Sequence, residues 1–233
     1  MQINNIEYKT FFCNDMKEII IYCHGYGENK YSCQKFVESL NKSKLGVISF
    51  DFPCHGDDQT LYQDVTIDMC LEYIDTIYNF ILHNNPNIPI SIVGKSFGGY
   101  IVLNYINTKK IKFHKVILIC PAVNFYECTK RKIHIDDNYF NNNEYFELPS
   151  GYRIYKEFYF DAKKFDVVKE FNKNDNDIYI IHGSNDKTVF LDEVLDLTKQ
   201  YDIKIKIIDG TDHHMNGYDE LITKEIITYI NEI

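Results

Sequence analysis

The sequence predicts an α/β fold in which a mainly parallel, twisted sheet carries helices on both faces. Short apolar runs typical of buried strands alternate along the chain with longer stretches whose apolar residues recur at helical spacing. Such alternation favours parallel strands joined by helices. The chain has 233 residues, of which 45% are hydrophobic and 25% charged, values typical of a globular protein. We therefore expect a single domain over residues 1–233.

Each expected element rests on local pattern. In the stretch 66–84 seven apolar residues fall on one helical face: Ile67, Cys70, Tyr73, Ile74, Ile77, Phe80 and Ile81. The expected strands lie near 5–12, 18–23, 46–51, 88–94, 115–120, 178–182 and 203–208. The expected helices lie near 30–42, 66–84, 97–108, 187–200 and 217–231. No internal repeat or linker interrupts this order.

A serine follows the apolar run that ends at Val93, within the motif Gly94-x-Ser96-x-Gly98. A helical pattern begins directly after it. Small residues two before and two after a serine allow a sharp strand-to-helix turn, which lifts the hydroxyl clear of the backbone. The motif alone is moderately specific, but its position between strand and helix predicts a nucleophilic serine.

A phosphate-binding loop, G-x-x-x-x-G-K-[ST], overlaps the same residues through Gly94-Lys95-Ser96. That loop requires glycine at position 89, where this chain has proline, and a flexible loop where this chain has strand residues. We therefore reject this interpretation. Lys95 is expected to face solvent or to form a salt bridge.

A nucleophilic serine requires a base, and the base requires an acid that orients it. Asp186 closes a polar loop after the strand at 178–182, whereas Asp175 and Asp177 precede that strand and lie at the wrong end of the sheet. His213 and His214 follow the strand at 203–208. Because ligands of open α/β sheets bind at the carboxyl ends of the strands, these loops are expected to converge on the serine.

Acyl transfer also requires N–H groups that bind the oxyanion of the tetrahedral intermediate. The residue after the nucleophile, Phe97, is expected to supply one. The strand at 18–23 is followed by His24-Gly-Tyr26-Gly27, and the Tyr26 N–H is expected to supply the other. His24 is expected to stabilise this loop. A plain glycine turn is the alternative interpretation.

From about residue 18 to the C-terminus, the chain resembles the α/β-hydrolase family of serine hydrolases. Within it the chain resembles small esterases, acyl hydrolases and serine aminopeptidase-like members. The segment 210–215, Gly-Thr-Asp-His-His-Met, is similar to a Gly-x-Asp-His-x-Phe segment of the family, which favours His213 over His214 as the base. The resemblance thus implies a triad of Ser96, Asp186 and His213. The loop after 46–51 departs from the family pattern Asp-x-x-Gly-His-Gly, because Cys54 replaces the first glycine.

The stretch between the strand that ends at Cys120 and the strand that begins at residue 178 is too long for a simple connection. We therefore expect residues 125–160 to form a cap or lid over the active site. Eleven of these 36 residues are Phe or Tyr, about 31%, against 15% in the whole chain. Aromatic rings above the serine would line a pocket for an apolar acyl or aryl group. For any single ring, packing of the cap onto the sheet is the favoured alternative, so none is named as a binding residue. Similar hydrolases with short caps include feruloyl and cinnamoyl esterases.

These observations predict a carboxylesterase that acts on a small-molecule ester and needs no metal or organic cofactor. An aminopeptidase-like peptidase or a thioesterase would use the same residues, and a non-catalytic protein that binds a small ligand is a distant alternative. The net charge of −9 argues against nucleic acid or anionic membrane as partners. Seven scattered cysteines without a Cys-x-x-Cys pair indicate reduced thiols in the cytoplasm. The N-terminus lacks the features of a signal peptide, and no apolar run is long enough to span a membrane.

Overall fold

The computed structural model describes residues 1–167, 169 and 171–232. These residues form an eight-stranded sheet in the order β1-β2-β4-β3-β5-β6-β9-β10. Neighbouring strands from β4 to β10 in this order are parallel, whereas β2 pairs antiparallel with β4, and β1 with β2. The strands are β1 (Gln2–Ile3), β2 (Ile6–Phe11), β3 (Glu18–Cys23), β4 (Leu45–Phe50), β5 (Ile90–Lys95), β6 (Val116–Ile119), β9 (Ile178–Gly183) and β10 (Lys204–Ile208).

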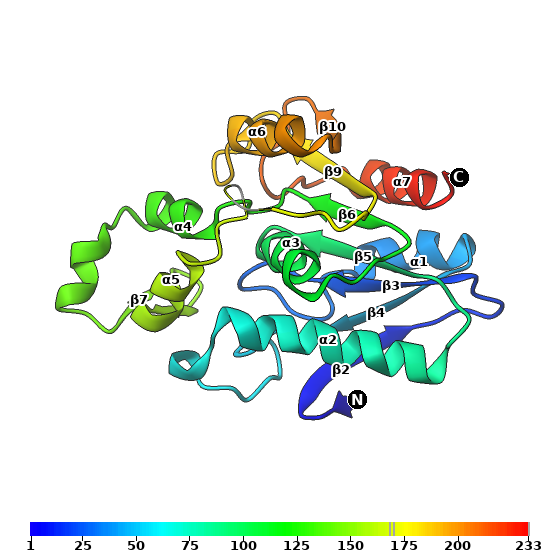
Figure 1. Ribbon diagram of the computed structural model, residues 1–233, viewed down its shortest axis with the longest axis horizontal. Coiled ribbons are helices and arrows are strands. Elements are labelled where there is room, and N and C mark those ends of the chain that lie inside the picture. Colours follow the sequence, from blue (N-terminus) through cyan, green and yellow to red (C-terminus); the bar gives the residue numbers. More distant parts are fainter. Residues whose placement is uncertain (168, 170, 233) are drawn as a thin grey trace.

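Helices cover both faces of the sheet (Figure 1). They are α1 (Gln34–Lys42), α2 (Ile67–Asn84), α3 (Phe97–Lys109), α6 (Leu191–Tyr201) and α7 (Asp219–Ile230), with a short 3-10 turn η1 (Tyr62–Asp64) before α2. Successive strand residues point to opposite faces: Ile19 and Ile21 pack with α2 and α3, and Ile20 packs with α1 and α7. Because both faces are buried, apolar residues predominate along the central strands, with a few polar ones such as Ser49, Ser91 and His182. The predicted fold class is confirmed.

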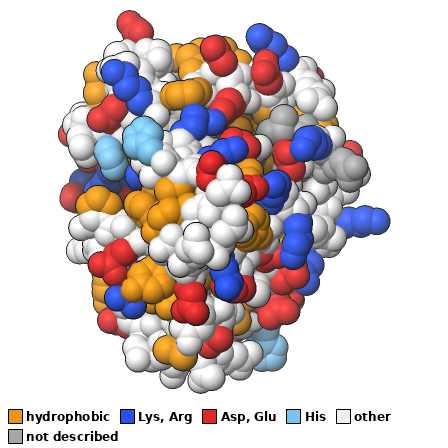
Figure 2. Space-filling view, turned by 90° about the vertical axis from the view of Figure 1, so that its left-hand side faces the viewer, with side chains coloured by type: hydrophobic (Ala, Val, Ile, Leu, Met, Phe, Trp, Pro, Cys, Tyr) orange, Lys and Arg blue, Asp and Glu red, His pale blue; other side chains and the backbone are white. Residues whose placement is uncertain are grey.

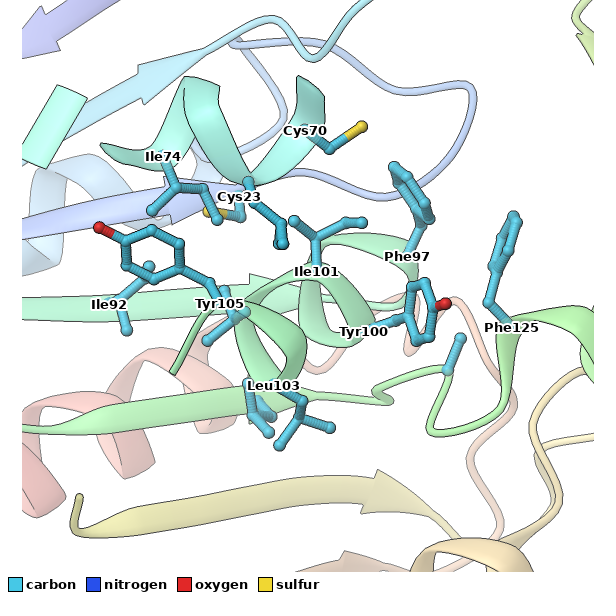
Figure 3. Close-up of a cluster of buried hydrophobic side chains, with 14 of the residues drawn as sticks. Cys23, Cys70, Ile74, Ile92, Phe97, Tyr100, Ile101, Leu103, Tyr105 and Phe125 are labelled. Carbon is cyan, nitrogen blue, oxygen red and sulfur yellow. The ribbon is translucent and has the colours of Figure 1, made fainter. Parts of the chain in front are cut away.

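The central helix α3 is buried at every position from Phe97 to Ile106. In Figure 3 the Tyr105 ring of this helix lies between Ile74 of α2 and Ile92 of β5. At its first turn, the rings of Phe97 and Tyr100 contact Phe125. A fully packed helix holds its N-terminus rigidly, and Ser96 stands at that N-terminus.

Two expected helices begin later than predicted. Helix α1 begins at Gln34 instead of residue 30, and α6 begins at Leu191 instead of residue 187. The residues before them form turns and loops that carry other contacts: the Lys30 N–H binds the Asp51 carboxylate, and the Thr188 N–H binds Asp186. A tertiary hydrogen bond thus holds the chain before α1 in a loop, whereas a local turn closed by the Asp186 side chain precedes α6.

The chain between β6 and β9 leaves the sheet and forms a separate group of small elements, at the left of Figure 1. They are α4 (Phe125–Ile133), η2 (Asp137–Asn141), the antiparallel pair β7 (Tyr145–Glu147) and β8 (Arg153–Tyr155), and α5 (Lys156–Ala162). The sequence patterns predicted none of these elements individually. On the face that they form, hydrophobic side chains lie among charged ones (Figure 2).

All seven cysteines lie in the described part of the chain, and all are free thiols. None of the described helices has both the length and the apolar character needed to cross a membrane.

Candidate active site

Ser96 stands on a strained turn between β5 and α3. Its φ of 51° and ψ of −114° lie outside the helical and strand regions, a geometry that is rare for residues other than glycine. The flanking glycines are required by close contacts. A Cβ on Gly94 would lie 2.8 Å from the Gly98 carbonyl oxygen, and one on Gly98 would lie 2.2 Å from the Cys23 carbonyl oxygen. The turn therefore needs the Gly-x-Ser-x-Gly pattern for steric reasons.

The loops after β9 and β10 bring an acid and a histidine to this serine. His213 Nε2 lies 2.8 Å from Ser96 Oγ, and His213 Nδ1 lies 2.7 Å from Asp186 Oδ2. The other carboxylate oxygen of Asp186 accepts hydrogen bonds from the N–H groups of Thr188 and Val189, at 2.8 and 2.9 Å. The structure thus joins the three residues in one chain of hydrogen bonds.

The surroundings of Asp186 keep it ionised. Burial by itself would raise the pKa of this carboxyl, but the hydrogen bond and charge of His213 and the two N–H donors lower the pKa below its ordinary value. An ionised Asp186 accepts the Nδ1–H of His213, which leaves Nε2 unprotonated toward the serine. This is the tautomer that can accept a proton from Ser96.

A second histidine, His182 of β9, lies beside the acid. Its Nε2 is 3.1 Å from the Val189 carbonyl oxygen and 3.5 Å from Asp186 Oδ2. Burial lowers its pKa, so the imidazole is neutral and donates to Val189. Sequence reasoning missed this residue, because it lies inside an apolar strand with no polar neighbour to mark it.

The loop after β3 approaches the serine closely. A Cβ on Gly25 would lie 3.6 Å from Ser96 Cβ, and the rings of Tyr26 and Phe97 lie 5.5 Å apart, edge to face. Neither the Tyr26 N–H nor the Phe97 N–H donates a hydrogen bond to another described residue. Phe97 directly follows Ser96 and Tyr26 lies in the loop that packs against it, and both N–H groups are unpaired among the described residues.

His24 supports this loop, as the sequence predicted. Its side chain is fully buried, and its Nε2 accepts a hydrogen bond of 3.0 Å from the Phe52 N–H. Since Nε2 is an acceptor, Nδ1 carries the proton and donates to the Gly25 carbonyl oxygen at 2.8 Å. Burial lowers the pKa of His24, which is consistent with this neutral form. Cys54, at the position where the family pattern has glycine, has a φ of 62°, a left-handed conformation that glycine adopts more readily than other residues.

A cavity of about 330 Å³ opens at the serine. Its buried wall is apolar, and its exposed rim is polar; His214 lies among the lining residues, next to His213. The apolar wall consists of Ala122, Phe125, Cys128, Ile133, Ile154 and Val189. Most of this wall comes from α4 and β8, two of the elements between β6 and β9. Those elements therefore shape the cavity.

The rim of the cavity carries an ion pair between Glu28 and Lys95. Both side chains are largely buried, with 28% and 12% of their surfaces exposed. Burial would raise the pKa of Glu28, but the charge of Lys95, its hydrogen bond and the Gly25 N–H lower it. Glu28 is the sole carboxylate among the described residues that line the cavity, and Lys95 neutralises it.

A mainly parallel sheet with a serine, an acid and a histidine after the ends of β5, β9 and β10 defines the class of α/β-type serine hydrolases. Comparison with known families agrees. Residues 14–134 match the serine aminopeptidase S33 family, and residues 87–219 match the prolyl oligopeptidase family. Each match covers more than half of the chain, and the chain belongs to the α/β-hydrolases that include these two families.

Two curated proteins are related to part of the chain. A proposed esterase/lipase of Mycoplasma genitalium is 27% identical over 127 residues, which cover 54% of this chain and 46% of that protein. A proposed monoglyceride lipase of Schizosaccharomyces pombe is 26% identical over 116 residues, which cover 48% of this chain and 31% of that protein. The chain thus spans less than half the length of the curated relatives it matches.

Solved structures share the fold over almost the whole chain. Est1E from Butyrivibrio proteoclasticus, with ferulic acid bound, superimposes with a TM-score of 0.85 at 19% identity, covering 97% of this chain and 95% of that one. A monoacylglycerol lipase from Paleococcus ferrophilus gives 0.76 at 19% identity, covering 97% and 98%. At such identities the likeness establishes the common fold.

Proposed function

We propose that this protein is a serine hydrolase that cleaves a carboxylic ester with a small apolar acyl or aryl group. One observation carries the proposal: the hydrogen-bonded series Ser96–His213–Asp186 opens directly onto a cavity with an apolar wall. Activation of a serine by a histidine that an acid orients is the requirement for acyl transfer. The partial relatives named for esterase and lipase activity support the same reaction.

In the proposed mechanism, His213 Nε2 takes the proton of Ser96 as Oγ bonds to the ester carbonyl carbon. The N–H groups of Tyr26 and Phe97 bind the oxyanion, and their lack of other partners supports this role. His213 then returns the proton to the leaving alkoxide, and the alcohol departs. Water attacks the acyl-enzyme with His213 as base, releasing the acid and restoring Ser96.

The segment 125–160 is proposed to act as the cap of this site. Support comes from α4 and β8, whose residues Phe125, Cys128 and Ile154 form part of the apolar wall of the cavity. An acyl or aryl group bound against these side chains would be removed from water, which contributes about 25 cal/mol of binding free energy per Å² of apolar surface buried. Single aromatic rings elsewhere in this segment pack against one another and have no proposed substrate contact.

An ester substrate is favoured over the substrate of an aminopeptidase, a peptide with a free N-terminus. An aminopeptidase must bind a protonated amine, which calls for a free carboxylate near the serine. Glu28, the carboxylate among the described lining residues, is already paired with Lys95. The family match to serine aminopeptidases concerns descent and fold, and the cavity offers an uncharged substrate a better fit.

The test is hydrolysis of p-nitrophenyl esters from acetate to decanoate, beside feruloyl esters and aminoacyl p-nitroanilides, with Ser96→Ala as control. We expect turnover of esters that disappears in the variant, together with fluorophosphonate labelling of Ser96. Turnover of aminoacyl substrates alone would establish a peptidase. A protein that neither hydrolyses any substrate nor reacts with the fluorophosphonate would be a ligand-binding protein instead.

A further inference from the structure

Glu28 forms two hydrogen bonds with Gly25, and together they close the turn that carries the Tyr26 N–H. The Glu28 N–H donates to the Gly25 carbonyl oxygen at 3.0 Å, and the Gly25 N–H donates to Glu28 Oε2 at 3.2 Å. Gly27 has a φ of 79°, as the third residue of a tight turn often does. Tyr26 therefore lies within the four-residue turn 25–28, whose first and last residues are joined by both of these hydrogen bonds.

The second carboxylate oxygen of Glu28 binds Lys95 Nζ. Lys95 is the last residue of β5 and directly precedes Ser96. One carboxylate thus links the backbone of the loop after β3 to the strand that presents the nucleophile and, one residue further, the Phe97 N–H. This link crosses 67 positions of sequence, and it joins the two segments that carry the two N–H groups of the proposed oxyanion hole.

We propose that Glu28 and Lys95 are positioning residues that fix the Tyr26 and Phe97 N–H groups at the spacing the oxyanion requires. This inference rests on the proposed serine hydrolase function. The packed helix α3 already holds the Phe97 N–H, so the pair ties the loop that carries Tyr26 to this fixed end. The pair is mostly shielded from solvent, with 12% of Lys95 and 28% of Glu28 exposed. Such shielding strengthens a charge-assisted hydrogen bond relative to one in open water.

A positioning role predicts a particular kinetic pattern. The oxyanion exists in the tetrahedral intermediate and in the transition states beside it, so a loosened oxyanion hole lowers kcat and leaves KM nearly unchanged. A misplacement of about 1 Å costs on the order of 100-fold in rate. Glu28→Ala, which removes both links, is expected to lower kcat roughly 10- to 100-fold. Lys95→Met and Glu28→Gln each leave one link, and their kcat values are expected to lie between those of Glu28→Ala and wild type.

The experiment is a double-mutant cycle with Glu28→Ala, Lys95→Met and their combination, measured on the best p-nitrophenyl ester. Because the residues act as one unit, the double variant is expected to be no slower than Glu28→Ala alone. Affinity for an alkyl trifluoromethyl ketone, whose adduct with serine carries an oxyanion, should fall by the same factor as kcat. Affinity for the corresponding methyl ketone should stay within twofold. Glu38→Gln in the exposed Glu38–Lys42 pair serves as the matched control and should change neither.

The outcomes separate this inference from the function on which it rests. Two results would overturn the positioning role while the enzyme remains a hydrolase. One is a double variant whose loss in kcat is the product of the two single losses, and the other is a rise in KM with kcat retained. An active wild type whose Glu28→Ala variant keeps full kcat would do the same. A wild-type protein that hydrolyses no ester and forms no ketone adduct would overturn both proposals together.

Discussion

The Tyr26 hydroxyl donates a hydrogen bond of 2.8 Å to the carbonyl oxygen of Arg153, which lies 127 residues away in the sequence. Tyr26 belongs to the loop beside Ser96, and Arg153 begins β8 of the segment between β6 and β9. The Tyr26 ring also stacks on Phe158 of α5 and meets Tyr152 edge to face. The Tyr26 side chain therefore joins the loop beside Ser96 to the proposed cap.

Tyr26→Phe tests this connection. The change keeps the ring and the backbone N–H and removes one hydrogen bond, so the free energy of unfolding should fall by about 1 kcal/mol. Hydrogen exchange of the β7–β8 hairpin (Tyr145–Tyr155) should become faster, measured by mass spectrometry. Tyr31→Phe, in a side chain that is 47% exposed, is the control. Unchanged exchange in the hairpin would mean that other contacts hold the cap in place.

Asp186→Asn tests the acid. Asparagine cannot hold His213 in the tautomer that accepts the serine proton, so kcat for the ester should fall on the order of 10⁴-fold, as in other triads. The measurement is steady-state kinetics on the p-nitrophenyl esters, with the exposed Asp192→Asn as control. A loss below about tenfold would point to another acid as the partner of His213.

His213→Ala and His214→Ala test the choice between adjacent histidines. Only His213 lies within hydrogen-bond distance of both Ser96 and Asp186 in the structure. Its removal should abolish nearly all turnover, whereas loss of His214 from the cavity rim should change kcat/KM by less than about tenfold. Fluorophosphonate labelling of Ser96 should follow the same order. The reverse result would assign the base to His214.

Stability should depend on pH through the buried His55. Burial lowers the pKa of His55 to about 3 from an ordinary value of 6.5, and its Nε2 has no hydrogen-bond partner among the described residues. Between these values the unfolded chain binds a proton that the folded protein does not, so stability falls as pH decreases from about 6.5 toward 3. This histidine should contribute a slope near 1.4 kcal/mol per pH unit below its unfolded pKa.

Urea unfolding of wild type and His55→Gln from pH 4.5 to 7.5 measures that slope. The variant is expected to be less stable at pH 7, since glutamine fills the site poorly, but its stability should depend less steeply on pH. Only the difference in slope tests the argument. Equal slopes in the two proteins would show that folding does not shift the pKa of His55.

Much of the fold could be predicted from the sequence because its signals are local. The central strands are apolar runs with a break at each end, and the period of 3.6 in α2 is clear over 18 residues. The predicted helix starts at residues 30 and 187 were each four residues too early, because a tertiary hydrogen bond to Asp51 and a local turn closed by Asp186 precede the helices, which begin at Gln34 and Leu191. The small elements between β6 and β9 follow no long period and could not be predicted one by one.

The site residues could be predicted because their signals are also local. The roles of these residues in catalysis remain predictions that the experiments above test. Ser96, Asp186 and His213 each follow a recognisable strand, and parallel strands place their carboxyl ends at one edge. The supporting residues have no such signal. Glu28 and Lys95 look like ordinary surface charges in the sequence, and His182 looks like part of a strand.

The sequence by itself determined the strands, the steric need for glycine on both sides of Ser96, and the edge of the sheet where the chemistry lies. These are properties of short segments, set by backbone sterics and by hydrophobic period. Only the tertiary structure decided which side chains meet across long separations: Tyr26 with Arg153, and Glu28 with Lys95. Such pairs depend on how loops pack after the sheet has formed, and that packing brings together residues whose sequence neighbours carry no trace of the contact.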